Sequence, residues 1–380
     1  MSGHISELTT AGLKPKTLAT IEAEAARNHV NLSYEDIYGF FHFLYTGGSI
    51  PVTAERMELK YGSGWSDRNA ARRISVTCQK LYPILKARCL WPEDVLNHAN
   101  NRCFHLDEAM QDKVIGVMDT VPLRTQHCRS RGDEDFSGKY CEYVWKLFTV
   151  TSLTGFTIFV GPALYSGRSG DSVIYDHSGV HTHLQSTGRA VFGDGGFVNN
   201  DNVIIPHPRN VIWPQKVPHD EKKYDTYVEE GENKLRFNAI VSYYRARAEH
   251  PYSRNWFGRF RAFLVWTHSP ALCYMSAICA LGALNIELWL DHDWAGKYKI
   301  PENLQHALLG SRMMQRERYP QPPRPELRKR FQSKRSRESE PKVQLTLAQS
   351  VQRMERTWPA EQPAVLLFVD QIDEEDKNDE

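Results

Sequence analysis

The sequence predicts an α/β domain that is preceded by an all-α unit. Between residues 33 and 90, apolar residues recur at spacings of three and four, as they do on one face of an α-helix. From residue 113, short β-branched runs replace this periodicity, and an amphipathic helix follows over 235–250. We therefore expect four parts, a polar N-terminal segment, a helical domain, an α/β domain and a tail. Their predicted bounds are 1–32, 33–110, 111–295 and 296–380.

Composition excludes several classes of protein. The chain has 380 residues, 41% hydrophobic and 24% charged, which is typical of globular proteins, and its net charge of +1 indicates no partner. The polar N-terminus lacks the apolar stretch of a secretory signal, so we expect none. The most apolar run, 271–284, is shorter than the roughly 20 residues that span a bilayer, and it predicts a buried helix. The seven cysteines form no CxxC pair, which indicates a reducing compartment and neither a disulfide scaffold nor a zinc finger.

The helical domain has the order of a helix-turn-helix unit. A short helix over 17–28 precedes it; Ser33 can cap the first helix of the domain, and a second helix follows Pro51. After a glycine-rich turn, Ser66 or Asp67 can cap a third helix, which is basic. In helix-turn-helix proteins the last helix enters the major groove of DNA. An ordinary three-helix bundle with a solvated basic face fits the pattern at least as well. The candidate DNA-binding residues of the third helix are Arg68, Arg72 and Arg73.

Short apolar runs predict the strands of the α/β domain. Thr154-Gly155 separates the second run from the third and predicts a hairpin turn, and a short helix near 172–175 lies between the third run and the fourth. The four runs are 113–123, 143–150, 156–160 and 190–193.

The helix over 235–250 carries two stripes. One is apolar, and beside it a polar stripe recurs at spacings of four, three and four residues. Such a helix can pack by its apolar stripe and line a site with the polar one, although this pattern alone favours a solvated surface helix. The polar stripe consists of Asn238, Ser242, Arg245 and Glu249.

The tail is first basic and then acidic, and we expect it to be largely disordered. Six of the ten residues over 328–337 are basic, which predicts a nuclear-import patch or a nucleic-acid contact, while a solvated linker is an equally good interpretation. Residues 370–380 contain seven acids. The candidate DNA-binding residues of the tail are Arg328, Lys329, Arg330, Lys334 and Arg335.

Three carboxylates stand out by their context. Asp119 ends the apolar run IGVM, Asp194 ends AVFG, and Glu249 lies on the amphipathic helix. Carboxylates at strand ends and on a helix can converge on a pair of divalent cations, which prefer oxygen ligands and catalyse phosphodiester cleavage. A chain with 46 acids offers many such triples, so the pattern alone has low specificity.

Seven segments resemble, in order, those of the DDE superfamily endonucleases, in particular PIF/Harbinger transposases. GVMDTVPL resembles the strand of the first aspartate, VFGDGGFVNNDNVIIPH resembles the Gly-Asp-x-Gly-Tyr/Phe segment, and FNAIVSYYRARAEH resembles the helix of the glutamate. The similarity extends from about residue 40 to 290. The other four segments are LYTGGS with the basic helix after it, FSGKYCEYVWKLFTVTSLTG, SGRSGDSVIYD and SAICALGALNIEL.

The resemblance implies a ribonuclease-H-like fold and a set of site residues. It implies that a divalent metal, Mg²⁺ or Mn²⁺ and expected as two ions, binds the catalytic carboxylates. It suggests Asn238 and Arg245 as supporting residues. Asp171 matches a position typical of the family but is not expected to be a ligand. The catalytic and metal-binding residues that the resemblance implies are Asp119, Asp194 and Glu249.

The resemblance also implies a function. Such an enzyme cleaves DNA at transposon ends and joins the ends to target DNA, and it acts in the nucleus. A separate Myb-like DNA-binding protein is an expected partner, and a homo-oligomer is possible. A retained, catalytically weak or inactive factor that binds DNA or protein is the alternative, and a cellular nuclease acting on RNA or damaged DNA is a third.

Two departures from the family pattern support the alternative. Thr120 and Val121-Pro122 replace the residues that usually follow the first aspartate. Pro251 lies two residues after Glu249, and because proline disrupts helices we expect Glu249 in a last or kinked turn.

Other site chemistries have less support. His177, His181 and His183 could bind a transition metal, but no cysteine or carboxylate lies nearby at zinc spacing, so we expect a solvated histidine-rich loop. The sequence contains no GxxxxGKS loop, GxGxxG fingerprint or GxSxG elbow, so nucleotide-driven and serine-hydrolase functions lack support.

Overall fold

The computed structural model describes residues 12–322 with gaps. The gaps are 48, 63, 98–100, 104–105, 107, 126–132, 198–199, 219, 255–269 and 291–314. The described residues form two compact units. Unit 1 comprises 12–206 and 240–290, and unit 2 comprises 207–239 and 315–322. The predicted domain bounds at 32, 110 and 295 stay predictions.

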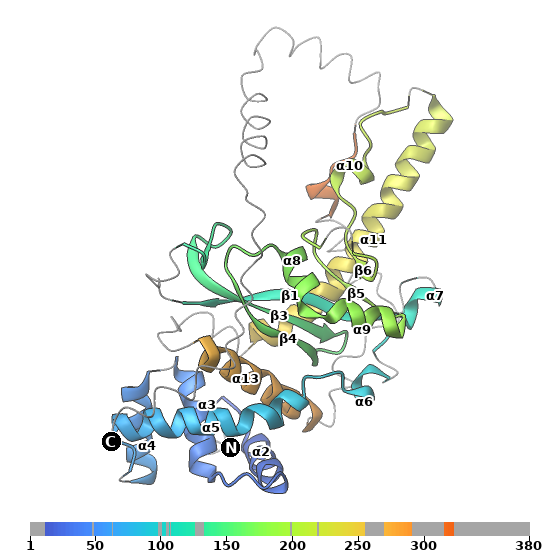
Figure 1. Ribbon diagram of the computed structural model, residues 1–380. Coiled ribbons are helices and arrows are strands. Elements are labelled where there is room, and N and C mark those ends of the chain that lie inside the picture. The colour runs from blue at the N-terminus through green and yellow to red at the C-terminus, as the bar shows by residue number, and fades with distance from the viewer. Residues whose placement is uncertain are drawn as a thin grey trace, which may run out of the picture. The chain divides into compact units, whose positions relative to one another are not determined.

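Unit 1 begins with helices whose starts and ends lie near the predicted capping residues and glycines (Figure 1). Ser33 caps the first helix of the predicted domain in a capping box with Asp36, and Gly47 ends that helix in the left-handed conformation at φ 97°. The helix from Ile50 has its proline in the first turn, where the missing N–H costs no hydrogen bond. The helices are α2 (Pro15–Arg27), α3 (Tyr34–Thr46), α4 (Ile50–Tyr61) and α5 (Asp67–Ala87).

The apolar helix α13 (Pro270–Leu290) is a core helix of unit 1, as predicted for 271–284. Among the described residues it is the one helix whose length and composition would allow it to cross a membrane. Its buried residues share one hydrophobic cluster with α2, α3 and α5, and with the sheet residues Val121 and Leu147. A Cβ at Gly282 would lie 2.4 Å from the Leu85 carbonyl oxygen, so glycine permits the close approach of α13 to α5. The buried amide of Asn285 hydrogen-bonds both backbone groups of Thr157, which ties α13 to the sheet.

A mixed six-stranded sheet forms the centre of unit 1. Its order is β2-β3-β1-β5-β6, and β4 also pairs with β3. β1 pairs antiparallel with β3 and parallel with β5, and β5 pairs parallel with β6. This mixed sheet with flanking helices is consistent with a ribonuclease-H-like fold. The strands are β1 (Val114–Arg124), β2 (Phe136–Ser137), β3 (Glu142–Ser152), β4 (Thr157–Ser166), β5 (Ala190–Phe192) and β6 (Val203–Ile204). All four predicted runs are strands; the two-residue strands β2 and β6 were not predicted.

The two faces of the sheet contact different helices. Met118 and Phe148 belong to a cluster with α8 (Asp171–Ser178) and α9 (Val180–Thr187), whereas Val121 belongs to the cluster around α13. The histidine-rich segment is therefore helical, and its prediction as a loop was wrong. Ile174, Tyr175, Val180 and Leu184 bury one side of this helix pair, at a spacing that the interspersed histidines obscured. Two short helices, α6 (Glu93–Leu96) and α7 (Glu108–Gln111), precede β1.

Helix α11 (Glu221–Arg254) is longer than the predicted 235–250. It begins in unit 2 and ends in unit 1. Its backbone stays helical through Pro251 to Arg254. The prediction that Glu249 lies in the last turn of the helix was therefore wrong. The charged sequence over 221–234, with Gly231 in it, concealed the helical start. A Cβ at Gly231 would lie 2.0 Å from the Trp213 ring, so glycine is required there by packing rather than by a turn.

Unit 2 has a small aromatic core. Trp213 and Tyr227 pack with Ile212 of α10 (Arg209–Ile212) and with Leu235. Residues 315–322 dock on this core, where the Trp213 indole donates to the Tyr319 carbonyl over 3.0 Å. These eight residues lie in the part predicted as a largely disordered tail, and here the structure differs from the prediction.

Candidate active site

Asp119 projects from β1 toward the face of the sheet that α11 covers. Val117 pairs with Phe192 of the parallel neighbour β5, and alternation places Asp119 on the same face as this pair. The ring of Tyr244, from α11, stacks on Phe192 with 5.6 Å between centroids. Asp119 is half-buried, and its Oδ1 accepts the backbone N–H of Thr120 over 2.8 Å.

Asp194 is the second residue after the end of β5, the parallel neighbour of β1. Counting two residues onward from the Val117–Phe192 pair reaches Asp119 in one chain segment and Asp194 in the other. The chain turns at this point, since Asp194 Oδ1 accepts the Gly196 N–H over 2.8 Å and the Asp194 carbonyl accepts the Phe197 N–H. The Phe197 side chain is buried and anchors the turn. Adjacent strands lie about 4.8 Å apart, and Asp119 and Asp194 each follow the Val117–Phe192 pair by two residues, so we call the region around them the carboxylate edge of the sheet.

Asp171 is a third carboxylate at this edge. It is the first residue of α8, and its Oδ1 accepts the hydroxyl of Thr120 over 3.0 Å. The ammonium of Lys146, from β3, lies 3.6 Å from the same oxygen and donates to the Ser169 carbonyl over 2.6 Å. Lys146 is only 8% exposed, so its charge is compensated inside the protein rather than by water.

The turn after Asp194 is tied directly to α8. The Ser172 hydroxyl donates to the Gly196 carbonyl over 2.7 Å. A Cβ at position 196 would lie 3.0 Å from Asp194 Oδ1 and 3.1 Å from Asp171 Oδ2. Two carboxylates therefore border the same point, and only glycine leaves their positions undisturbed. Hydrogen bonds thus connect β1, α8 and the turn after β5.

Lys139 experiences the charge of all three aspartates. It lies in the turn between β2 and β3 and is exposed. Partial burial acts to lower the pKa of its ammonium, whereas the phenol of Tyr140 acts to raise it. The carboxylates of Asp171, Asp194 and Asp119 also raise this pKa, and the net shift is upward. Lys139 therefore lies within electrostatic range of all three carboxylates.

The predicted residues of α11 fall in different places. Arg245 is half-buried in unit 1, while the side chain of Glu249 lies outside the described residues. Asn238 belongs to unit 2, where its buried amide accepts the His207 N–H over 2.7 Å and donates to the His207 carbonyl over 2.9 Å. Both polar atoms of this amide are used in holding the backbone, so the structure gives Asn238 a structural contact rather than one with the carboxylates.

The donors at the edge of the sheet suit a divalent cation in kind. Carboxylate oxygens are hard ligands of the type that Mg²⁺ and Mn²⁺ prefer. Within the part of the chain that the structure describes, no three His, Cys, Asp or Glu side chains are grouped closely enough to hold one ion. The prediction that Asp119, Asp194 and Glu249 bind metal therefore stays a prediction, and the Glu249 side chain lies outside the described residues.

The three histidines do not form a metal site. The ring of His183 stacks on Trp91 with 3.8 Å between centroids, and His177 Nδ1 lies 3.0 Å from the Val173 carbonyl of its own helix. His181 Nε2 lies 3.2 Å from the neighbouring Thr182 hydroxyl. Their contacts are local, as expected for residues without a common ligand.

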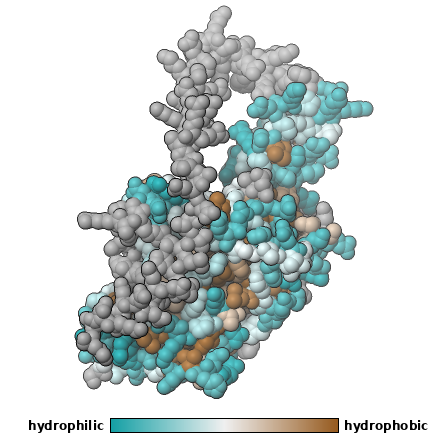
Figure 2. Space-filling model, in the orientation of Figure 1, coloured by the Kyte–Doolittle hydropathy of each residue, from teal (hydrophilic) through white to brown (hydrophobic). Residues whose placement is uncertain are grey.

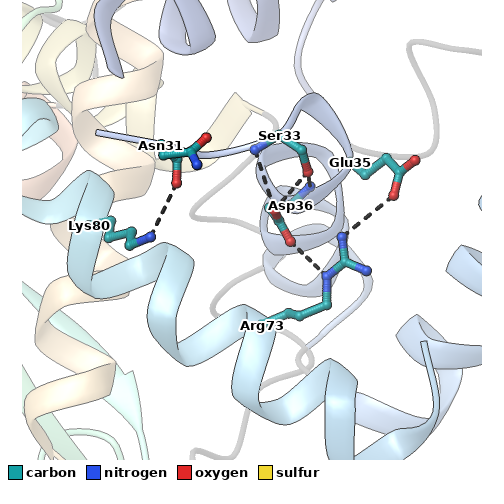
Figure 3. Close-up of polar contacts among 6 residues, drawn as sticks. All are labelled: Asn31, Ser33, Glu35, Asp36, Arg73 and Lys80. Carbon is teal, nitrogen blue, oxygen red and sulfur yellow. Dashed lines mark hydrogen bonds and ion pairs between the residues drawn. The ribbon is translucent and has the colours of Figure 1, made fainter. Parts of the chain in front are cut away.

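Of the basic residues on α5, Arg73 differs from the other two. Its guanidinium pairs with Asp36 over 2.7 Å and with Glu35 over 3.5 Å (Figure 3). It also lies 4.0 Å above the Trp65 ring. These contacts hold α5 against the start of α3, and the prediction of Arg73 as a DNA contact stays a prediction. Arg68 and Arg72 are exposed. The tail candidates Arg328, Lys329, Arg330, Lys334 and Arg335 lie outside the described residues.

Sequence reasoning missed the two lysines of the site. Lys146 had a signal, because it is a charged residue within the apolar run YVWKLFTV, and a buried charge in a strand needs a partner. Lys139 had none, because a lysine in a turn is ordinary. Asp171 was noted only as a family-typical position, and its link to Thr120 joins residues that are 51 positions apart.

The fold is a mixed sheet with flanking helices, and carboxylates lie on β1, after β5 and at the start of α8. Residues 118–281 match the family model described as DDE superfamily endonuclease. This segment includes Asp119, Asp171, Asp194 and Glu249. The match supports the superfamily, a nuclease-type enzyme and DNA as its substrate. Comparisons with curated proteins and with solved structures gave no match.

Proposed function

We propose that the protein is a metal-dependent DNA endonuclease of the PIF/Harbinger transposase type, which cleaves transposon ends and joins them to target DNA. The observation that supports this proposal is the parallel pairing of β1 and β5 up to Val117 and Phe192, since Asp119 and Asp194 each follow that pair by two residues within the matched segment. In the proposed reaction, water attacks a phosphodiester at the element end and the 3′ oxygen leaves as a hydroxyl. That hydroxyl then attacks a target phosphodiester, whose own 3′ oxygen leaves.

The catalytic carboxylates are, in this proposal, Asp119, Asp194 and Glu249. Two divalent cations, Mg²⁺ or Mn²⁺, when bound by these residues would supply the activation of water and the stabilisation of the leaving oxygen. The protein's own part is positioning. Thr120 holds Asp119 through its N–H and Asp171 through its hydroxyl.

Lys146 and Lys139 have separate parts in the proposal. Lys146 balances Asp171 beneath the site, where both side chains are largely buried. Lys139 stands at the exposed rim, and its protonated ammonium would attract a DNA phosphate to the carboxylate edge. Arg245, on the same stripe of α11 as Glu249, would support that glutamate.

Recognition of the DNA is proposed to involve other parts of the chain. Arg68 and Arg72 of the helix-turn-helix-like region, and the basic tail, would contact backbone phosphates. A separate Myb-like protein would supply sequence specificity. The protein would act in the nucleus, and a homo-oligomer would bring two element ends together.

The second candidate function is a retained factor that binds DNA or protein and has weak or no catalytic activity. The observation in its favour is the changed segment after the first aspartate, where Thr120 now bonds Asp171 and Pro122 continues β1. This segment has become part of the structural network around the site. Convergence of the Glu249 carboxylate on the two aspartates would argue against this candidate.

The test of the proposal is nicking of plasmid and short duplex DNA in the presence of Mg²⁺ or Mn²⁺. We expect cleavage by the wild type and a loss of about 10³-fold or more in Asp194→Asn, as for the removal of a catalytic group. Asp176→Asn is the matched control, because Asp176 is an exposed aspartate of α8 outside the site, and it should cleave normally. If no variant cleaves even with element ends and a DNA-binding partner supplied, while duplex binding persists, the retained binding factor is correct.

A further inference from the structure

One side of α5 presents a stripe of exposed residues at spacings of four. Arg68, Arg72, Val76 and Lys80 follow one another on this side, and Val76 is 39% exposed. The opposite side of α5 is buried against α13 and α3, which fixes the orientation of the stripe. At a rise of 1.5 Å per residue, the stripe is about 18 Å long. One DNA strand places about five phosphates along such a length, at about 3.4 Å of helix axis each.

A hollow of about 450 Å³ lies beside this stripe. The segment Asn31–Leu32, the start of α3 and the Gly64 turn border it, so the middle of α5 lies at the floor of a hollow rather than on a ridge. Figure 2 shows that most of the described surface in its view is hydrophilic. The polar residues that line the hollow are Asn31, Asp36, Asn69, Arg72, Arg73 and Lys80.

The acid in this lining is neutralised within the protein. Asp36 accepts the N–H and hydroxyl of Ser33 and the Nε–H of Arg73 (Figure 3). Partial burial alone would raise the pKa of Asp36, but the hydrogen bonds from Ser33 and Arg73 and the charge of Arg73 lower it overall. Asp36 and Arg73 thus form a fixed pair at the border of the hollow, and Arg73 also pairs with Glu35, which does not line the hollow.

The remaining cations are available to a ligand. Arg72 makes no hydrogen bond or ion pair with any described residue. Lys80 Nζ donates to the Asn31 carbonyl over 3.1 Å, which uses one of its three N–H groups and holds the ammonium at the border of the hollow. Asn69 is exposed one turn away, and its amide can donate to a phosphate oxygen. The hollow therefore combines two uncompensated cations with neutral donors.

We propose that this hollow binds the phosphodiester backbone of duplex DNA through Arg72, Lys80 and Asn69, with Arg68 extending the contact along α5. The inference rests on the proposed function and gives the helical region a particular part in it, namely contact with the backbone rather than reading of base edges. A helix that contacts base edges must enter a major groove about 12 Å wide. The Asn31–Leu32 segment beside α5 would hinder such entry, because it borders the same hollow. Arg73 shapes the hollow and does not touch the DNA.

The experiment measures binding of a fluorescent 30-base-pair duplex by anisotropy, as a function of KCl concentration, with the full chain and no divalent metal. Each lost phosphate contact should reduce the slope of log K against log salt by about one. Arg72→Ala and Lys80→Ala should each reduce this slope by about one, and the double variant should reduce it by about two. The loss should be equal for duplexes of unrelated sequence. Lys16→Ala is the matched control, because Lys16 is an exposed lysine of α2 outside the hollow, and its slope should stay that of the wild type.

Several outcomes would overturn the inference. Unchanged slopes in the double variant would remove the hollow from the DNA interface, and so would a wild type that fails to bind duplex at low salt. A loss confined to one duplex sequence would indicate reading of bases instead. Binding is measured without divalent metal and cleavage with it, so failure of the nuclease assay and failure of this binding assay are separate results. Thermal unfolding of each variant checks that the helices remain folded, since Arg72 and Lys80 are exposed.

Discussion

The edge of the sheet and the hollow beside α5 contain the same kinds of groups in opposite proportion. At the sheet edge, three aspartates face two lysines, and one of the lysines is buried beneath Asp171. At the hollow, one aspartate is paired with an arginine, and Arg72 and Lys80 remain. An excess of carboxylates suits a cation, and an excess of cations suits a phosphate. The comparison shows that ion pairs within the protein determine which charges at each surface stay available to bind a ligand.

The largest effect on one of these two surfaces is expected from a substitution at position 196. In Gly196→Ala, the new Cβ would press on Asp194 Oδ1 and Asp171 Oδ2, and both carboxylates would have to move. The required shift is a few tenths of an ångström, so we expect metal-dependent cleavage to fall, but by less than the roughly 100-fold that a misplacement of 1 Å costs. Nicking assays measure this loss.

Gly195→Ala is the matched control, because a Cβ at Gly195 would meet no other atom within 4 Å. It should cleave within about threefold of the wild type. Duplex binding through the hollow should be unchanged in both variants. If Gly196→Ala cleaves as well as Gly195→Ala does, the carboxylates are not constrained by this turn.

The second prediction concerns the buried pair beneath the site. Asp171→Ala leaves the Lys146 ammonium without its carboxylate, and we expect a loss of about 2–3 kcal/mol in the free energy of unfolding. Lys146→Met combined with Asp171→Ala removes both charges and should recover most of this loss, because an apolar side chain of similar length can replace the lysine in the core. Urea unfolding of the two single variants and the double variant gives the coupling energy. Additive losses would show that Lys146 does not depend on Asp171.

The elements of the fold were predictable where the signal is local. The four apolar runs became β1, β3, β4 and β5, and the capping box at Ser33 marked the start of α3. The signal failed where a distant partner decides. The start of α11 was not predicted because Gly231, which usually weakens a helix, is required there by the close approach of the Trp213 ring. The histidine segment is helical because its apolar side packs against the sheet.

The site was predictable only in part for the same reason. Asp119 and Asp194 follow apolar runs, which is a local signal, and the parallel register of β1 and β5 then makes them neighbours. Arg73 has the same local sequence signal as Arg72, and only the fold pairs it with Asp36. Asp171, on α8, joins the site through Thr120 of β1 and Lys146 of β3. Composition on one helix cannot show which of its charges are already paired.

The third prediction separates these two arginines. Arg73→Ala removes two ion pairs and the contact with the Trp65 ring, and we expect a loss of about 1–2 kcal/mol in the free energy of unfolding. Arg72→Ala should change this free energy by less than about 0.5 kcal/mol, as for an exposed residue. Thermal unfolding in the absence of DNA compares the two. Equal stabilities would mean that Arg73 is a surface cation after all, and the hollow would then carry one more charge for DNA.

The smallest expected effect is the pH dependence that Asp36 contributes. Its pKa in the folded protein lies below its ordinary value of 3.8, so the folded state favours the ionised carboxylate. The stability that this provides is present above pH 3.8 and is lost as the pH falls through the lower folded value. We expect Asp36→Asn to be less stable than the wild type by about 1 kcal/mol at pH 7, and the difference should vanish at the acidic end. Urea unfolding between about pH 7 and about pH 2.5 measures it.

The same comparison in an Arg73→Ala background isolates the cause. Without the guanidinium, Asp36 loses one hydrogen bond and the charge that holds its pKa down, while the Ser33 contacts remain. The pH-dependent part of the stability lost in Asp36→Asn should therefore shrink but not disappear. If it is unchanged, Ser33 alone keeps Asp36 ionised, and Arg73 would then be held to α3 by Trp65 and Glu35 rather than by the pair that closes the hollow.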